Sequence, residues 1–193
     1  MAEEKKGILY LCGTPIGNLE DITFRAVRVL GEVDVIYAED TRRAQKLLTR
    51  YNIRKPVVSY YQHNCRERIP EILALMSAGK NVALVSDAGM PGLSDPGQEL
   101  VARVREEGYT IVPVPGPSAV VTALAASGIH APRFVFEGFL PRRSGEKRER
   151  LEALRSEPRA VVIFESPRRL VSTLADLEEI IGDRKCAVLR ELT

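Results

Sequence analysis

The segment with the most unusual chemistry is residues 86–97, Ser-Asp-Ala-Gly-Met-Pro-Gly-Leu-Ser-Asp-Pro-Gly. Three glycines and two prolines in twelve residues predict a rigid backbone path that exposes amide groups to a ligand. Asp95 followed by Pro96 is typical of the start of a helix, so we assign Asp95 a structural role. Asp87 has no such structural reason to be there, and we predict that it is functional.

Two other segments combine a carboxylate with arginines: Glu39-Asp40-Thr41-Arg42-Arg43 and Glu165-Ser166-Pro167-Arg168-Arg169. A carboxylate and an arginine side by side can hold a ribose hydroxyl and a phosphate, which suits a nucleotide substrate. The structural alternative is that Asp40 or Thr41 only caps a helix and that the arginines are solvated.

Basic residues also gather at Arg142 and Arg143, just before a predicted helix, where they are well placed to meet a phosphate backbone. The basic residues that follow are interleaved with glutamates, as on a solvated helix face. The loop after the first strand begins Gly-Thr-Pro-Ile-Gly-Asn and lacks both the P-loop and the dinucleotide-binding spacing. In this loop Asp21 is predicted to cap the next helix, and Ser118 is predicted to cap a later one.

These loops must be positioned by the elements around them. Short β-rich runs alternate with stretches of helical period, which predicts an α/β fold with a mostly parallel sheet, whose ligands bind at the carboxyl ends of the strands. The expected strands are 8–13, 33–38, 56–60, 82–86, 110–113, 134–138, 160–165 and 185–192. The expected helices are 23–30, 41–51, 66–78, 98–107, 119–127, 146–155 and 168–181. We expect two α/β domains, residues 1–117 and 118–193.

The composition, with 45% hydrophobic and 28% charged residues and a net charge of +2, is that of an ordinary globular protein rather than a nucleic-acid-coating one. Three well-separated cysteines and two isolated histidines predict neither a disulfide framework nor a metal site. The apolar run 8–12 is too short for a signal peptide or a membrane span, so we expect a cytoplasmic protein with no membrane partner.

Six motifs in order closely resemble the tetrapyrrole (precorrin) methylase superfamily, in particular its branch that methylates ribosomal RNA. They are the segments 13–19, 39–42, 86–97, 115–119, 138–141 and 165–168. The resemblance covers residues 7–193. It implies two α/β domains of the class III methyltransferase type, S-adenosylmethionine as cofactor in the cleft between them, and a homodimer. It also implies methylation of the ribose 2′-hydroxyl of a decoding-centre cytidine in 16S rRNA, so that the partner is the small ribosomal subunit.

Carried over to this sequence, the resemblance places nine residues at the cofactor: Pro15, Asp87, Ala88, Gly89, Gly92, Leu93, Ser118, Ala119 and Leu140. On the substrate side it points to Asp40, Arg42 and Arg168, to which the basic pair Arg142 and Arg143 is added. Met90 departs from the family, which more often has threonine there. Because the family chain normally continues past Thr193, the second domain is expected to be incomplete.

A ribose hydroxyl is a poor nucleophile at neutral pH, so a base should remove its proton. Asp40 and Glu165, each at a predicted strand end, are the proposed bases. Two other functions stay open: methylation of a tetrapyrrole or another small molecule on the same fold, and a cofactor-binding module without activity. The two pairs Asp40 with Arg42 and Arg142 with Arg143 favour an RNA substrate, because a corrin ring does not require them.

Overall fold

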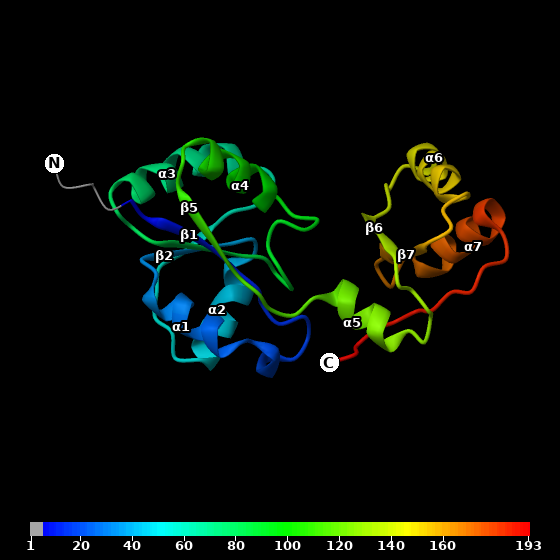
Figure 1. Ribbon diagram of the computed structural model, residues 1–193, viewed down its shortest axis with the longest axis horizontal. Helices are drawn as coiled ribbons and strands as arrows, with labels where there is room; N and C mark the ends of the chain where they lie inside the picture. Colours follow the sequence, from blue (N-terminus) through cyan, green and yellow to red (C-terminus); the bar gives the residue numbers. More distant parts are fainter. Residues whose placement is uncertain (1–5) are drawn as a thin grey trace. The chain divides into compact units, whose positions relative to one another are not determined.

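The computed structural model describes residues 6–193 and divides the chain into two compact units. Of the described residues, the first unit comprises 6–119 together with Thr193, and the second comprises Val120–Leu192 (Figure 1). In the part of the chain that is described, no helix is both long and apolar enough to cross a membrane.

The first unit is built on a five-stranded parallel sheet with the strand order β3-β2-β4-β1-β5. Its strands are β1 (Ile8–Cys12), β2 (Val35–Ala38), β3 (Val57–Ser59), β4 (Val82–Val85) and β5 (Thr110–Val114). Its helices are α1 (Phe24–Glu32), α2 (Thr41–Arg50), α3 (Cys65–Ser77) and α4 (Gly97–Glu106), with a short 3-10 helix at Leu19–Asp21. Figure 1 shows α1 and α2 on one face of the sheet and α3 and α4 on the other.

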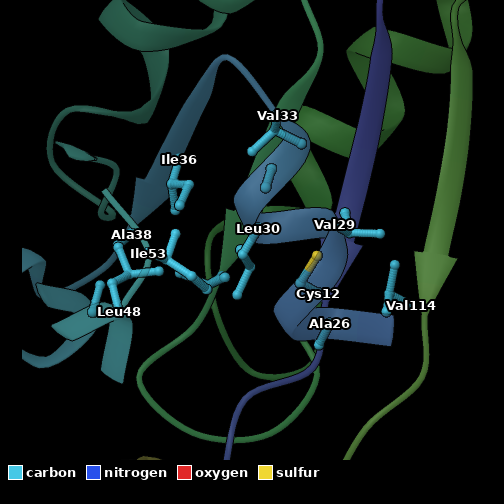
Figure 2. Close-up of a cluster of buried hydrophobic side chains, with 13 residues drawn as sticks. Cys12, Ala26, Val29, Leu30, Val33, Ile36, Ala38, Leu48, Ile53 and Val114 are labelled. Carbon is cyan, nitrogen blue, oxygen red and sulfur yellow. The ribbon is translucent and has the colours of Figure 1, made fainter. Parts of the chain in front are cut away.

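The two-residue period of the strands divides the core into two layers. In β4, Ala83 and Val85 join the cluster beneath α1 and α2, whereas Val82 and Leu84 join the cluster beneath α3 and α4. Figure 2 shows the first cluster, where Leu30 of α1 packs beside Ile36 of β2. Every residue of β4 is buried, as expected for a central strand of a sheet covered on both faces.

Strands β1 and β4 are neighbours in the sheet, and the chain segments that follow them run in opposite directions across it. The chain leaves β1 toward β2 on one side and leaves β4 toward β5 on the other, and the connecting helices α1 and α4 lie on opposite faces (Figure 1). In open α/β sheets, ligands bind at the carboxyl ends of strands at such a switch point. The loops after β1 and β4 are therefore the expected place of a ligand site.

The second unit contains a parallel pair of strands, β6 (Phe134–Phe139) and β7 (Ala160–Phe164). Its helices are α5 (Ala119–Ala126), which begins at the unit boundary, α6 (Ser144–Leu154) and α7 (Leu170–Ile181). Leu140, Leu151 and Ile180 form its buried core.

The expected α/β fold with a parallel sheet is confirmed, with two local differences. Residues 185–192 form no strand; their apolar residues have a strand-like pattern, but neither β6 nor β7 pairs with them. Asp21 lies in the 3-10 helix and does not cap α1; Thr23 does, accepting the Ala26 N–H at 3.1 Å. Aspartate and threonine are both common capping residues and here lie two positions apart, so the sequence alone did not decide which of them caps α1.

Candidate functional site

The loops after β1 and β4 are joined to each other at the switch point. Thr14 and Gly89 exchange backbone hydrogen bonds, 2.9 Å from the Thr14 N–H to the Gly89 carbonyl and 3.1 Å in the reverse direction. The buried Thr14 hydroxyl also donates to the Ser86 carbonyl at 3.1 Å. Two loops separated by more than seventy residues in sequence are thus held as one surface.

The loops after β1 and β5 approach so closely that only glycines fit between them. A Cβ atom added to Gly13 would lie 2.8 Å from the Gly116 Cα, and one added to Gly116 would lie 2.9 Å from the Gly13 Cα. Gly89 has φ +83°, a left-handed backbone that disfavours side chains. These glycines fix the path of the main chain around the candidate site.

Asp95 holds the second half of the β4 loop. Its Oδ1 accepts the backbone N–H of Gly92 at 2.8 Å and that of Gly97 at 2.7 Å, and its Oδ2 also lies 2.9 Å from the Gly92 nitrogen. Between these anchors Gly92 and Ser94 both have positive φ. The structural role predicted for Asp95 agrees with these contacts, although Pro96 and not Asp95 occupies the N-cap position of α4.

Asp87 connects the β4 loop to the end of β2. Its Oδ1 accepts the backbone N–H of Asp40 at 3.0 Å, and its Oδ2 lies 3.3 Å from the Arg43 guanidinium. The Asp87 side chain is still 29% exposed. A partly exposed carboxylate that is oriented by its neighbours can accept a hydrogen bond from a ligand.

Asp40 is the N-cap of α2, which is the structural alternative considered for it. Its Oδ1 accepts the Arg42 N–H at 2.9 Å, and the Arg42 guanidinium contacts both carboxylate oxygens. The side-chain hydrogen bond from Arg42, with the backbone bond, lowers the pKa of Asp40 to about 2. So low a pKa makes Asp40 a weak proton acceptor, which argues against its predicted role as base.

Glu39 is the acidic residue that the sequence analysis did not select. Although it is exposed overall, it lines a small cavity together with Ser86 and Asp95. Desolvation, followed by repulsion from Asp87 and Asp95, raises the pKa of Glu39. The sequence did contain a signal: Glu39 directly precedes the capping residue Asp40 and is not needed for the cap itself.

The remaining cofactor residues predicted in the first unit differ in accessibility. Pro15 is buried beside the Thr14 bridge, whereas Ala88 and Leu93 are exposed on the β4 loop. Ser118 and Ala119 are half-buried where α5 begins, after the loop that contains Gly116. The structure thus collects Pro15, Asp87, Ala88, Gly89, Gly92 and Leu93 in two joined loops.

In the second unit Glu165 is the centre of a buried polar network. Its side chain is 6% exposed and accepts 2.7 Å hydrogen bonds from the Ser166 N–H, the Arg169 Nε and the Thr173 hydroxyl. Burial would raise the pKa of Glu165, but these hydrogen bonds outweigh it and lower the pKa. Glu165 therefore ties the end of β7 to α7, and this geometry argues against its predicted role as base.

Lys147 extends this network and corrects the expectation that all basic residues of α6 are solvated. It is 9% exposed, and its ammonium group lies 2.9 Å from the Thr173 hydroxyl and 2.5 Å from Asp176. A buried lysine needs such partners because an unpaired charge away from water is unstable. Sequence spacing alone did not distinguish it from the exposed Arg148 and Arg150.

Of the other predicted residues of the second unit, the three arginines lie apart from this network, and Leu140 meets it only through its carbonyl. Arg142, Arg143 and Arg168 are exposed, and Arg143 pairs with Glu146 at 3.2 Å. The side chain of Leu140 is in the core, while its carbonyl accepts from Arg169 at 3.4 Å. Leu140 can therefore offer a ligand little of its side chain.

Metal ligands are not grouped in the described residues. Within residues 6–193, no set of three or more histidine, cysteine, aspartate or glutamate side chains is arranged to hold a metal ion.

Comparison with known proteins identifies the family. Residues 8–193 match the family described as Tetrapyrrole (Corrin/Porphyrin) Methylases. A protein from Thermotoga maritima named "Ribosomal RNA small subunit methyltransferase I" is 55% identical over 97% of this chain and 84% of its own length. The protein of the same name from Bacillus subtilis is 51% identical over 97% of this chain, which spans 64% of that relative's length.

Solved structures agree on the fold. The native form of uroporphyrin III C-methyl transferase from Thermus thermophilus superposes with a TM-score of 0.66 at 20% identity, covering 92% of this chain and 78% of that one. Because the family match extends over both units, the chain belongs to the tetrapyrrole methylase family of methyltransferases.

Proposed function

We propose that this protein transfers a methyl group from S-adenosylmethionine to the ribose 2′-hydroxyl of a decoding-centre cytidine in 16S rRNA. The observation that carries the proposal is the 55% identity, over 97% of the chain, with a relative named as a methyltransferase of small-subunit ribosomal RNA. The ribose position and the cytidine rest on the motifs of the sequence. Methylation of a tetrapyrrole, which the family description also covers, is the competing substrate class.

The two joined loops have features that fit the cofactor. A Cβ atom on Gly92 would meet nothing within 4 Å, and Gly89 and Gly92 both have positive φ, so a ligand can lie directly against the main chain. The carboxylate of Asp87 is oriented and partly exposed, and it suits a ribose hydroxyl or an ammonium group. We therefore propose that S-adenosylmethionine, which supplies an electrophilic methyl group when bound, is held by Pro15, Asp87, Ala88, Gly89, Gly92, Leu93, Ser118, Ala119 and the main chain of Leu140.

The cavity beneath the β4 loop is not itself the cofactor site. Its volume of about 10 Å³ has room for a single water, far less than the ~300 Å³ of a typical ligand pocket. The cofactor is accordingly proposed to lie on the loops, above the cavity that Glu39 and Asp95 line.

We propose Glu39, in preference to Asp40 and Glu165, as the group that accepts the proton from the ribose hydroxyl. Both alternatives are already held in hydrogen bonds that lower their pKa values. The raised pKa of Glu39 makes it the stronger base, and it is exposed to a substrate. Arg42, which is 89% exposed beside Asp40, is proposed to contact a substrate phosphate, with Arg142, Arg143 and Arg168 as further contacts.

A homodimer in the cytoplasm remains part of the proposal. Helix α5 carries the exposed apolar side chain of Val121, and it is the surface we propose for self-association. Light scattering of the protein and of Val121→Glu tests this: a dimer mass that persists in the variant would exclude α5.

The experiment that tests the function is transfer of radiolabelled methyl groups from S-adenosylmethionine to small ribosomal subunits that lack the modification. Digestion of the product to nucleosides should place the label in 2′-O-methylcytidine. Label in a base, or transfer only to a tetrapyrrole acceptor, would contradict the proposed substrate. Cofactor binding without any transfer would favour a binding module.

A further inference from the structure

A strongly basic stretch of the chain without an acidic residue surrounds α2. Residues 41–66 contain seven of the 28 basic residues and none of the 26 acidic ones, so the rest of the chain has a net charge of −5. The near-neutral total charge of +2 therefore hides a strongly basic segment. Such a segment attracts polyanions even when the whole protein does not.

The fold places these charges on one exposed face. Ala44, Leu47 and Leu48 turn toward the core, so the opposite side of α2 is left to polar and basic residues. The exposed residues of α2 and the turn after it are Arg42, Arg43, Gln45, Lys46, Thr49, Arg50, Asn52 and Arg54. We call this surface the α2 basic face.

Most of the charge on this face is not neutralised within the protein. Arg42 pairs with Asp40 and Arg43 with Asp87, both at the start of the helix. Lys46, Arg50 and Arg54 form no ion pair with any residue in the range 6–193. Solvated basic side chains of this kind are available to neutralise phosphates.

The α2 basic face also contains a groove. A shallow groove of about 700 Å³ follows the helix, between α2 and the edge strand β3, and is lined by Thr41, Arg42, Gln45, Lys46, Thr49 and Val57. Lys46 and Arg50 are one helical turn apart, a rise of about 6 Å, on the same side of α2. The groove begins at Thr41, next to Asp40 and Glu39.

We infer that the α2 basic face binds the sugar-phosphate backbone of the RNA substrate, next to the nucleotide that is methylated. The inference rests on the proposed function and assigns the approach of the substrate to one surface of the first unit. The charge of this face favours RNA as the ligand. Basic side chains with hydroxyl and amide neighbours can contact phosphates and riboses, whereas a neutral small molecule would form no ion pair with Lys46 and Arg50.

The test compares two double variants with the same loss of charge. Lys46→Ala/Arg50→Ala changes the α2 basic face, and Arg103→Ala/Arg105→Ala changes α4, which lies on the opposite face of the sheet (Figure 1). All four side chains are exposed, so both variants should fold, as unchanged melting temperatures would verify. Binding to a fluorescent 16S rRNA fragment is measured by anisotropy over a range of salt concentrations, and methyl transfer is measured in parallel.

For Lys46→Ala/Arg50→Ala we expect the magnitude of the slope of log affinity against log salt to fall by about 1.4 to 1.8, since each lost phosphate contact removes about 0.7 to 0.9. The KM for RNA should rise while kcat and the affinity for S-adenosylmethionine stay unchanged. The α4 variant should match the unsubstituted protein.

An unchanged slope in the α2 variant, or an equal change in the α4 variant, would overturn the inference and leave the proposed function intact. If the unsubstituted protein neither binds nor methylates RNA, the proposed function itself fails, and the inference fails with it.

Discussion

Asp95 is expected to be essential for the geometry of the β4 loop, and replacing it tests how that loop is held. Asp95→Ala leaves the backbone N–H groups of Gly92 and Gly97 without their acceptor at 2.8 and 2.7 Å. A hydrogen bond to a charged acceptor contributes about 1.5 to 3 kcal/mol when buried, and roughly 1 kcal/mol at a partly exposed site such as this. Two lost bonds should therefore lower the free energy of unfolding by about 2 kcal/mol.

Asp95→Asn is the matched control. Its remaining oxygen can accept both N–H groups, as Oδ1 does now, but its amide nitrogen replaces the Oδ2 that lies 2.9 Å from the Gly92 nitrogen. We expect about half the loss of the alanine variant. Differential scanning calorimetry should show a fall in Tm of about 4 to 8 °C for the alanine variant, since 1 kcal/mol corresponds to roughly 2 to 4 °C at this size.

The same variants should separate stability from ligand binding. Asp95 holds the segment from Gly92 to Gly97, which includes the predicted cofactor residue Leu93. Asp95→Ala should therefore weaken S-adenosylmethionine binding severalfold at a temperature where the protein is still folded, and Asp95→Asn should weaken it less. An alanine variant with the Tm and cofactor affinity of the unsubstituted protein would show that Asp95 does not order this loop.

Three further predictions concern the close approach of Gly13 and Gly116, the carboxylate of Glu39 and the cysteine thiols. Gly116→Ala should lower the free energy of unfolding by about 1 to 3 kcal/mol and abolish cofactor binding, because its Cβ would meet main-chain atoms of Gly13. Gly31→Ala has open space around its Cβ and should be tolerated. Thermal unfolding measures the stability of both variants, and titration with the cofactor measures binding. Because a raised carboxyl pKa means that ionisation destabilises the folded state, Glu39→Gln should raise the Tm at neutral pH while lowering kcat. In the unsubstituted protein, kcat should decrease as the pH is lowered through the raised pKa of Glu39, because protonation removes the base. A Glu39→Gln variant with unchanged kcat would exclude this residue as the base. Burial raises the pKa of Cys12 to about 12, so under native conditions at pH 8 Ellman's reagent should modify the exposed Cys186 and leave Cys12 intact; rapid modification of Cys12 would contradict the packing beneath α1.

The sequence predicted the sheet of the first unit well because its signals are local. Each strand from β1 to β5 is a short apolar run bounded by glycine, proline or polar residues, and the structure places every one within about two residues of its prediction. The predicted strand 185–192 had the same local signal. It failed because a strand also needs a partner, and pairing depends on residues far away in the sequence.

The candidate site could be located but not resolved into roles. Glycine and proline spacing predicted an unusual backbone path in the loop 86–97, and the structure has positive φ at Gly89, Gly92 and Ser94 there; its role in binding stays a prediction. The choice among the candidate carboxylates depended on the hydrogen bonds that Asp40 and Glu165 accept, and on the desolvation of Glu39 and its repulsion by Asp87, none of which the sequence pattern shows. Proton affinity is set by three-dimensional neighbours, so only the structure could separate these carboxylates.

Cofactor binding is the claim on which every functional statement depends, and calorimetric titration with S-adenosylmethionine tests it most directly. We expect saturable binding at one site per chain, with affinity weakened by Asp87→Ala and unchanged by Arg103→Ala/Arg105→Ala. A folded protein that gives no saturable heat, or an Asp87→Ala variant that binds as tightly as the unsubstituted protein, would contradict it.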